Sequence, residues 1–136
     1  SDCTQEEIVN AYDNTIAYTD HILAAVIDRL EKQEDRLDVS MLYMSDHGES
    51  LGEFGLYLHG APYMIAPSQQ THVPFVLWLG KDAKAAYAGE CLAGETKKPQ
   101  SHDNLFHSVL GMMRVETKVR DPALDLLSAC RLGATS

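Results

Sequence analysis

The stretch Val39-Ser40-Met41-Leu42-Tyr43-Met44-Ser45-Asp46-His47-Gly48 decides the fold of this chain. Its first seven residues form a nearly continuous apolar run, which is typical of a strand buried on both faces, as in a parallel sheet. The run ends abruptly at Asp46, His47 and Gly48. Ligands bind at the carboxyl ends of strands in open α/β sheets, so the sequence predicts a functional site directly after this strand.

Regular patterns flank this stretch on both sides. Upstream, Thr4 and Glu7 fit a capping box, and apolar residues at helical spacing predict one helix from about Gln5 to Lys32. Downstream, Val73–Leu79 predicts a second buried strand that ends at Gly80. The glycines and prolines between the strands predict an irregular loop with a single helical turn, and loops of this length tend to be functional.

The last third of the chain predicts a surface segment followed by helices. Glycines and a proline break residues 81–100, which we expect to lack regular structure, and Ser101–Met113 resumes helical spacing. Asp121-Pro122 is expected to cap a short helix. The order of elements implies an α/β fold with a mainly parallel sheet flanked by helices. Two strands cannot make a buried parallel sheet, so an upstream portion of the domain is expected outside this sequence.

Composition limits the classes of function. The 136 residues suit one domain, and 20 acidic against 11 basic residues give a formal net charge of −9. Nucleic acid is excluded as a partner because phosphate contacts need clustered Lys and Arg. No apolar run is long enough to span a membrane, and the start of the sequence has no basic leader. The acidic balance suits a divalent metal, although surplus acid also serves solubility.

Asp46 and His47 are the candidate metal ligands, because an oxygen and a nitrogen donor side by side suit zinc. His59 follows twelve residues after His47 and can return to the same crevice if the loop folds back. The alternatives are a hydrogen-bonded turn at Asp46 and His47 and a surface histidine at position 59. Glu49 and Glu53 can line the same crevice, although solvated loop charges describe them better.

The other nucleophiles and histidines carry weaker signals. Ser45 belongs to the end of the strand and Ser50 has no obvious base, so neither is a convincing nucleophile. His107 falls among apolar helix positions and is expected to be packed or to cap a neighbour. His21, His72 and His102 have no setting that indicates catalysis.

Three cysteines leave two interpretations open. Cys91 and Cys130 bracket an irregular segment with helical patterns, so they can form a disulfide in an exported protein, and Cys3 would then find its partner upstream. Three buried free thiols in a cytosolic protein fit the composition equally well.

Several motifs together resemble one enzyme family. They are Tyr43–Glu53 (YMSDHGESLGE), Tyr57-Leu58-His59-Gly60, Ala11–Ile16 with Tyr18-Thr19-Asp20, and Ser101–Phe106 (SHDNLF). This combination closely resembles the C-terminal catalytic region of the lipid A phosphoethanolamine transferases, and it spans nearly the whole chain. The resemblance implies the alkaline phosphatase and sulfatase fold. Residues 1–136 are then the C-terminal portion of one periplasmic catalytic domain, whose upstream portion and N-terminal membrane helices lie outside this sequence.

The resemblance also implies roles for individual residues. Asp46 and His47 match two ligands of the catalytic Zn²⁺, and His59 matches a histidine that contacts the substrate phosphate or a second zinc ion. The family's remaining ligands, a glutamate and the nucleophilic threonine, would lie upstream. The family is rich in disulfides, which favours a bond between Cys91 and Cys130.

By the same resemblance, the intact protein acts at the periplasmic face of the bacterial inner membrane. It would transfer phosphoethanolamine from phosphatidylethanolamine to a lipid A phosphate through a covalent threonine intermediate, giving resistance to polymyxin and other cationic peptides. Three alternatives stay open. The protein could be a phosphodiesterase or sulfatase-type hydrolase of the same superfamily, or a transferase with another acceptor. The 136 residues could also act as a metal-binding fragment without catalysis.

Overall fold

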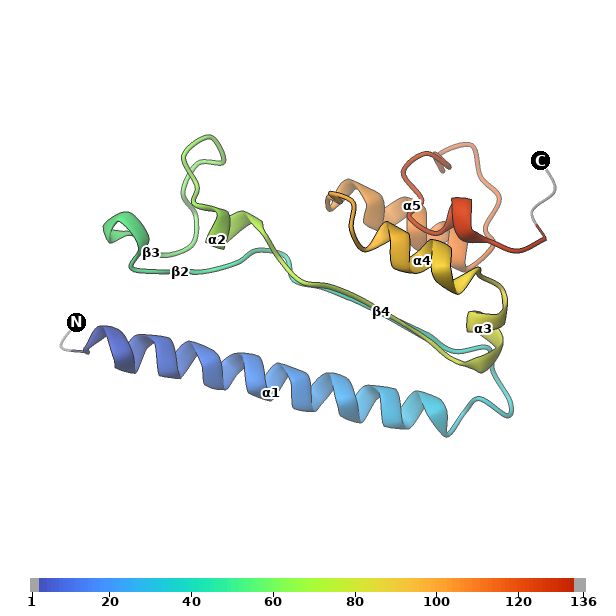
Figure 1. Ribbon diagram of the computed structural model, residues 1–136, viewed down its shortest axis with the longest axis horizontal. Coiled ribbons are helices and arrows are strands. Elements are labelled where there is room, and N and C mark those ends of the chain that lie inside the picture. Colours follow the sequence, from blue (N-terminus) through green and yellow to red (C-terminus); the bar gives the residue numbers. More distant parts are fainter. Residues whose placement is uncertain (1–2, 134–136) are drawn as a thin grey trace. The chain divides into compact units, whose positions relative to one another are not determined.

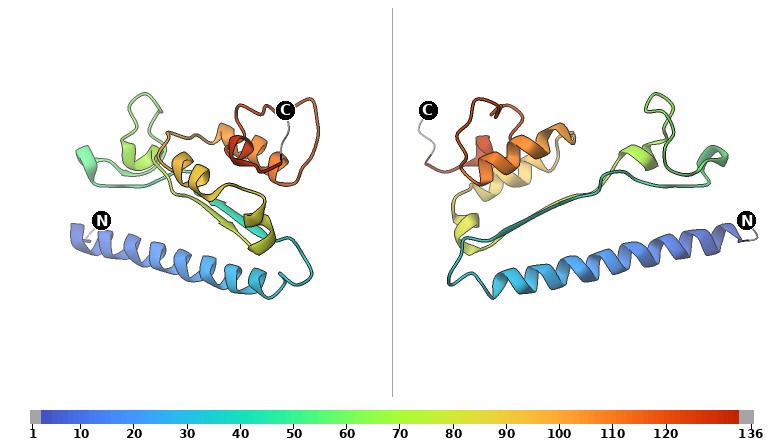
Figure 2. Two further views of the ribbon diagram at one scale, coloured as in Figure 1. Left: turned by 45° about the vertical axis from the view of Figure 1, so that its right-hand side comes forward. Right: turned by 180° about the vertical axis from the view of Figure 1, so that it is seen from behind.

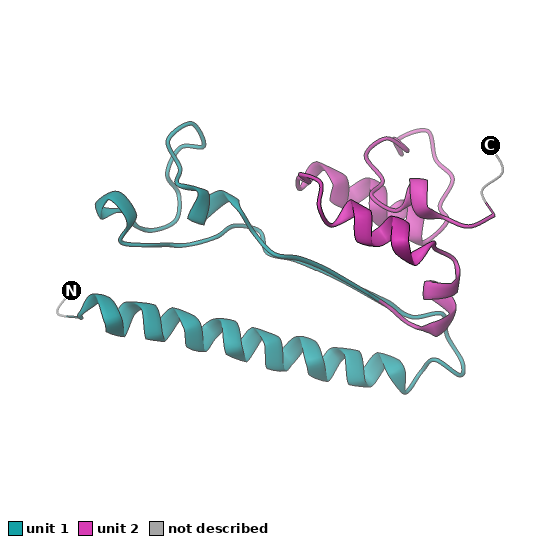
Figure 3. Cartoon of the chain, in the orientation of Figure 1, with its two compact units in different colours: residues 1–78 teal, residues 79–136 magenta. Residues whose placement is uncertain are grey.

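Figure 1 shows the computed structural model, which describes residues 3–133. The contacts divide the chain into two compact units, Ser1–Trp78 and Leu79–Ser136, which Figure 3 colours separately. The first unit contains the long helix, the strands and the loop between them. The second unit contains short helices and turns. The α/β class expected from the sequence is therefore present, with all strands ending by Leu79.

The first unit begins with helix α1, Gln5–Glu31, whose course is clear in both views of Figure 2. The predicted capping box is present: the Thr4 hydroxyl accepts from the Glu7 amide at 3.3 Å, and the Glu7 carboxylate accepts from the Thr4 amide at 2.8 Å. These bonds satisfy amides that have no partner inside the helix. No helix within residues 3–133 is long and apolar enough to cross a bilayer.

The two predicted strands are β1, Ser40–Met44, and β4, Phe75–Leu79, and they pair with each other. The Ser45 amide, just after β1, donates to the Pro74 carbonyl, just before β4, so the two strands run in opposite directions. The prediction of a mainly parallel sheet is therefore not confirmed by the described residues. The connection between β1 and β4 covers residues 45–74, a length that permits either direction, so local sequence signals alone did not decide between a parallel and an antiparallel pair.

The prediction that both strands are fully buried was wrong for these residues. Val39 and Met41 are buried at the start of β1, but the rest of β1 is half-buried and Val76 in β4 keeps 39% of its surface exposed. The cause is the pairing: within the described chain each of these strands has a single neighbour, so a continuous apolar run has too few partners to cover it.

The connection between β1 and β4 is more ordered than the sequence indicated. It contains β2, Ser50–Leu51, the 3₁₀ turn η1, Glu53–Gly55, and β3, Tyr57–Leu58, which pairs antiparallel with β2. The expected single helical turn is α2, Ser68–Thr71. Gly52 adopts φ +124° at the turn of the hairpin, a conformation that favours glycine.

The second unit contains α3, Lys81–Ala85, α4, Gly89–Glu95, α5, Asp103–Met112, and η2, Ser128–Cys130. Helix α5 confirms the predicted helix over Ser101–Met113. The expectation that residues 81–100 lack regular structure was wrong, because two short helices form there. Tertiary contacts override the weak local propensity: Cys91 of α4 is bonded to Cys130, and the Ala88 amide donates to the Cys130 carbonyl.

The short helix expected after Asp121-Pro122 is replaced by turns that lead into η2. The Asp121 carboxylate accepts from the Ala123 amide at 2.9 Å, and the Asp125 carboxylate accepts from the Leu127 amide at 3.0 Å. These side chains take the amides that a helix would bond to backbone carbonyls, which is the usual way in which Asp competes with helix formation.

The disulfide between Cys91 and Cys130 is formed, with the two Cα atoms 5.4 Å apart, and Cys3 is a free, exposed thiol. The interpretation of three buried free thiols is therefore wrong. The adjoining bridge between Tyr87 and Arg131 pairs the same two segments.

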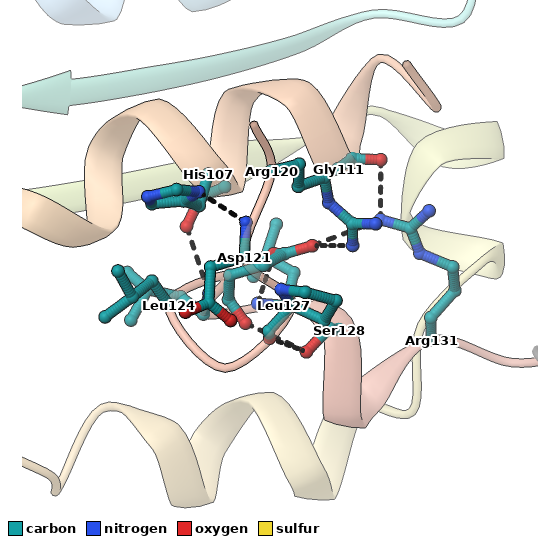
Figure 4. Close-up of polar contacts among 12 residues, drawn as sticks. His107, Gly111, Arg120, Asp121, Leu124, Leu127, Ser128 and Arg131 are labelled. Atoms are coloured by element: carbon teal, nitrogen blue, oxygen red, sulfur yellow. Dashed lines mark hydrogen bonds and ion pairs between the residues drawn. The ribbon is translucent and has the colours of Figure 1, made fainter. Parts of the chain in front are cut away.

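A buried carboxylate organises the rest of the second unit (Figure 4). The Asp125 side chain is fully buried, and its Oδ2 accepts from Arg120 Nη2 at 2.6 Å. Arg131 Nη2 lies 3.9 Å from the same oxygen and donates to the Gly111 carbonyl at 2.6 Å. Gly111 is required here, because a Cβ at this position would lie 2.0 Å from Asp125 Oδ2. Two charged pairs and a glycine thus join the end of α5 to the C-terminal turns.

Candidate metal centre

The polar side chains that form the candidate site lie at the hairpin of β2 and β3 and beside it. Ser50 is opposite Leu58 in the register, and Glu49 and His59 are the residues next to that pair at the open end of the hairpin. His47, which follows β1, lies beside them. Ligand atoms of His47, Glu49 and His59 all lie within 4.8 Å of one another. The loop does fold back to bring His59 to His47, as the sequence suggested.

His59 is oriented by Glu49. Its Nδ1 lies 3.2 Å from Glu49 Oε2 and 3.4 Å from Oε1. A carboxylate only accepts, so a neutral His59 that bonds Glu49 carries its proton on Nδ1 and has its lone pair on Nε2. Glu49 is the more buried partner, with 21% of its side chain exposed against 53% for His59. This is the arrangement by which carboxylates orient histidine ligands in metal sites.

His47 is prepared in a similar way by the backbone. Its Nδ1 lies 2.9 Å from the Gly48 carbonyl oxygen, which only accepts, so in a neutral His47 with this bond Nε2 holds the lone pair. The rings of His47 and His59 are 3.9 Å apart between centroids and tilted by 30°. Two imidazoles and a carboxylate side by side form a donor set that suits zinc.

Asp46 stands at the edge of this cluster. Its Oδ1 accepts from the His47 amide at 3.0 Å, and its Oδ2 is 3.8 Å from His47 Nε2. The carboxylate is 89% exposed, so it is open to a ligand from outside the described residues. The structure thus places Asp46 beside His47, but His47 shares its closer grouping with Glu49 and His59. The ligand roles of Asp46, His47 and His59 stay predictions.

The backbone around His59 is held in an unusual conformation. Leu58 has φ +65°, in the left-handed region that side chains other than glycine rarely adopt, and Gly60 has φ +97°. Non-glycine residues in this region cost about 1 kcal/mol or more and concentrate at functional sites. His59 is thus presented between two reversals of the chain rather than by a regular strand.

The remaining polar residues of the loop have local roles. The Glu53 carboxylate accepts from the Leu51 amide at 2.8 Å, and the Ser45 hydroxyl donates to the His47 carbonyl at 2.8 Å. Ser50 is 1% exposed and its hydroxyl accepts from Gln70. Glu53 therefore does not join Glu49 in the cluster. Among the described residues, neither serine presents a free hydroxyl to the histidines.

The histidines outside the cluster agree with their structural interpretation. His107 Nδ1 accepts from the Asp121 amide at 2.8 Å, so it caps the turn that follows, as expected. His21 stacks on Tyr18 along α1.

Apart from histidines, the ionisable side chains near the cluster in the sequence are acidic and not basic. The sequence holds no Lys or Arg from Leu37 to Gly80, and these residues include Asp46, Glu49 and both clustered histidines. No cationic side chain of this segment is available to neutralise a bound anion. A phosphate at this site therefore needs positive charge from a metal ion or from a residue outside the segment.

Glu49 is the site residue that sequence reasoning undervalued. Its distance from His59 along the chain gave no sign of their contact, and only the register of the β2–β3 hairpin creates it. The signal that could have found it is the pair of closely spaced glycines, Gly52 and Gly55, before the apolar run Leu56-Tyr57-Leu58, because such glycines favour a turn into a strand.

The chain matches a known family over most of its length. The model of the family named Sulfatase matches residues 1–115. Phosphoethanolamine transferase EptA of Escherichia coli K12 is 47% identical over 132 residues, covering 95% of this chain and 24% of that protein. Kdo(2)-lipid A phosphoethanolamine 7''-transferase of the same strain is 33% identical over 119 residues, covering 83% of this chain and 20% of that protein. The chain thus spans about a quarter of these relatives.

Solved structures give the same result. The soluble domain of lipooligosaccharide phosphoethanolamine transferase A from Neisseria meningitidis superposes with a TM-score of 0.90 at 44% identity, covering 95% of this chain and 40% of that chain. The C-terminal periplasmic domain of phosphoethanolamine transferase EptC from Campylobacter jejuni gives a TM-score of 0.81 at 44% identity, over 91% of this chain and 39% of that chain.

Proposed function

Because this chain belongs to the sulfatase family, we propose that it supplies part of the metal site of a phosphoethanolamine transferase. The protein that contains it would move phosphoethanolamine from phosphatidylethanolamine to a phosphate of lipid A. The observation that carries the proposal is the cluster of His47, Glu49 and His59 in a chain 47% identical to a relative of that name. The chain spans 24% of that relative, so the activity is proposed for the intact protein.

The cluster fits zinc by its donor chemistry. We propose Asp46 and His47 as ligands, and His59 as the group that contacts the substrate phosphate or a second zinc ion. A bound zinc ion supplies Lewis acidity and positive charge for the phosphoryl oxygens. We propose that the Glu49 carboxylate orients the His59 ring through Nδ1, so that a neutral His59 would offer Nε2 to the substrate phosphate or to a second zinc ion.

The charge distribution supports a metal. A phosphodiester placed against Asp46 and Glu49 meets two carboxylates, and the segment from Leu37 to Gly80 offers no basic side chain to offset them. Two unit charges 4 Å apart interact with about 4 kcal/mol at a protein surface, so uncompensated repulsion of this size would prevent binding. A divalent cation between the groups removes this repulsion.

The nucleophile is proposed to come from outside these 136 residues. Ser45 and Ser50 are the hydroxyl residues nearest to the cluster in sequence, and both hydroxyls are engaged in the fold. A threonine on another segment of the intact domain, as the family resemblance implies, would take the phosphoethanolamine group and release diacylglycerol. The lipid A phosphate would then displace the threonine.

The proposed setting is the periplasmic face of the inner membrane. The disulfide between Cys91 and Cys130 agrees with an oxidising compartment. Ethanolamine adds a positive charge to lipid A, and the modified outer membrane would bind polymyxin and other cationic peptides less strongly.

The test is mass spectrometry of lipid A from cells that express the intact protein. The comparison is between wild type, Asp46→Ala, His47→Ala and the control His72→Ala, whose side chain lies outside the cluster. We expect a phosphoethanolamine adduct with wild type and His72→Ala and at least a hundredfold less with the two ligand variants. Near-normal adduct in either ligand variant contradicts the metal assignment.

The same cells distinguish the hydrolase alternative. If all variants express normally and none yields the adduct, purified protein is incubated with phosphatidylethanolamine vesicles. Release of ethanolamine phosphate without an acceptor would then favour a hydrolase over a transferase.

A further inference from the structure

We propose that Gln70 is the positioning residue of the candidate metal centre, holding the segments of His47, Glu49 and His59 in register. The inference rests on the proposed function, because it assigns a role toward the metal that those residues would bind. Gln70 lies in α2 and is 7% exposed, so its amide is almost entirely removed from water. A buried amide is costly unless its donors and acceptor are bonded, and here they are.

The side chain of Gln70 bonds both strands of the hairpin. Its Nε2 donates to Ser50 Oγ at 2.8 Å and to the Leu58 carbonyl at 3.2 Å. Ser50 and Leu58 are direct cross-strand partners, and the next residues outward are Glu49 and His59. One amide group therefore spans the pair whose continuation places the Glu49 carboxylate against the His59 ring.

The remaining groups of Gln70 bond the chain beyond each histidine. Its Oε1 accepts from the Ala61 amide at 3.3 Å, two residues after His59, and its backbone carbonyl accepts from the Gly48 amide at 2.9 Å, directly after His47. Gly48 approaches so closely that a Cβ there would lie 1.9 Å from the Gln69 carbonyl oxygen. His47, Glu49 and His59 thus each neighbour a residue bonded to Gln70.

Only an amide side chain can make these contacts together. Two donors face a hydroxyl and a carbonyl, while an acceptor faces an N–H, and among side chains of this length only glutamine carries both. Gln70→Glu keeps an oxygen that can accept from the Ala61 amide. It replaces the NH₂ group, which carries both donors, with a carboxylate oxygen that would face the Leu58 carbonyl without a hydrogen bond. Gln70→Leu keeps most of the volume and removes all three bonds.

The test measures zinc affinity of the intact protein by competition with a chelator. Partners that orient metal ligands typically contribute ten- to a hundredfold to affinity, so we expect Gln70→Leu to bind zinc at least tenfold more weakly, and Gln70→Glu to lie between it and wild type. The matched control is Ser108→Ala, which removes a fully buried hydroxyl that accepts from the Leu126 amide in the second unit. It should lower stability and leave zinc affinity unchanged.

A purely structural role gives a different result. If Gln70→Leu lowers the unfolding midpoint as much as Ser108→Ala does, and the folded protein binds zinc as wild type does, the proposal is wrong.

Amide hydrogen exchange distinguishes a failure of the positioning role from a failure of the proposed function. We expect Gln70→Leu to speed amide exchange by at least tenfold at Ala61, which loses Oε1 as its acceptor, whether or not zinc is present, and Ser108→Ala to leave it unchanged. If wild type binds no zinc while exchange at Ala61 rises as expected, the proposed function fails and the positioning role stands. Unchanged exchange at Ala61 overturns the positioning role.

Discussion

Each unit holds several segments of the chain together, and the two units do so with different chemistry. In each, one buried polar side chain bonds several segments, and one glycine permits the close approach: Gln70 with Gly48 in the first unit, Asp125 with Gly111 in the second. The first uses a neutral amide and hydrogen bonds alone. The second uses a carboxylate between two arginines and adds a disulfide.

The difference indicates which of the two units a bound ligand can displace more easily. In the first unit the candidate ligands stay exposed, with 42% of the His47 side chain and 53% of the His59 side chain accessible. Neutral hydrogen bonds contribute about 1 kcal/mol each, so a bound ion can shift this loop at modest cost. The second unit is closed by a covalent bond and buried charge, which suits a supporting role.

Removing the disulfide should have the largest effect. The bond closes a loop with a sequence separation of 39 residues, and for a loop of that length chain entropy predicts a stabilisation of about 4 kcal/mol. This stabilisation is measured by unfolding the double variant Cys91→Ser with Cys130→Ser in denaturant and monitoring the transition by circular dichroism. Cys3→Ser is the control, since Cys3 is exposed and free, and should change stability by less than about 0.5 kcal/mol. Equal midpoints for wild type and the double variant would contradict the assignment of covalent closure.

Asp125→Ala should rank second. It leaves Arg120 and Arg131 without their shared carboxylate, and losing one partner of a buried ion pair costs about 3 kcal/mol. Arg120→Ala should reduce the further loss caused by Asp125→Ala, because the two residues form one pair. Additive effects in this double-mutant cycle would show that the two charges do not interact.

Gly48→Ala should rank third and act on the first unit alone. Its Cβ would meet the Gln69 carbonyl oxygen at 1.9 Å, so the segment after His47 must move, at a cost of about 2 kcal/mol. Zinc affinity should fall with it. Gly94→Ala in α4 is the matched control: nothing lies within 4 Å of its added Cβ, and alanine should stabilise that helix by about 0.5 kcal/mol. A neutral Gly48→Ala would show that the loop is looser than the contacts indicate.

The smallest effect lies at the start of α1. Hydrogen bonds from the Thr4 amide and then from the Thr4 hydroxyl hold the pKa of Glu7 below its ordinary value of 4.5. The folded pKa is the lower one, so this contribution to stability is present above the unfolded pKa and is lost as the pH falls through the folded pKa. Carboxyl titration by NMR measures the shift, and Thr4→Ala should raise the pKa of Glu7. An unchanged titration in that variant would show that the Thr4 hydroxyl does not bond the Glu7 carboxylate in solution.

Local signals in the sequence predicted part of this fold. The capping box, α1, α5 and the ends of both long strands follow from spacing and turn residues that act over a few positions. Strand direction and burial do not, because they depend on which segments become neighbours. The same run Val39–Ser45 suits a strand buried on both faces and a strand covered on one.

The residues of the candidate site divide in the same way, into those that local sequence signals predicted and those that only the fold revealed. Asp46 and His47 are adjacent in sequence, so their meeting needed no knowledge of the fold, and the family motif added His59. Glu49 and Gln70 became visible only through the hairpin register and the turn of α2, because their partners lie 10 and 20 residues away. Contacts of that span are set by the fold as a whole.

The absence of Lys and Arg from Leu37 to Gly80 also shapes how the protein is studied by proteolysis. Trypsin cleaves after Arg36 and next after Lys81, so a single peptide carries Asp46, His47, Glu49, His59 and Gln70 together. A covalent label on any one of these residues will shift the mass of that one fragment. Chymotrypsin can divide this peptide at the exposed Phe54 and Tyr63, which separates Asp46, His47 and Glu49 from His59, and His59 from Gln70.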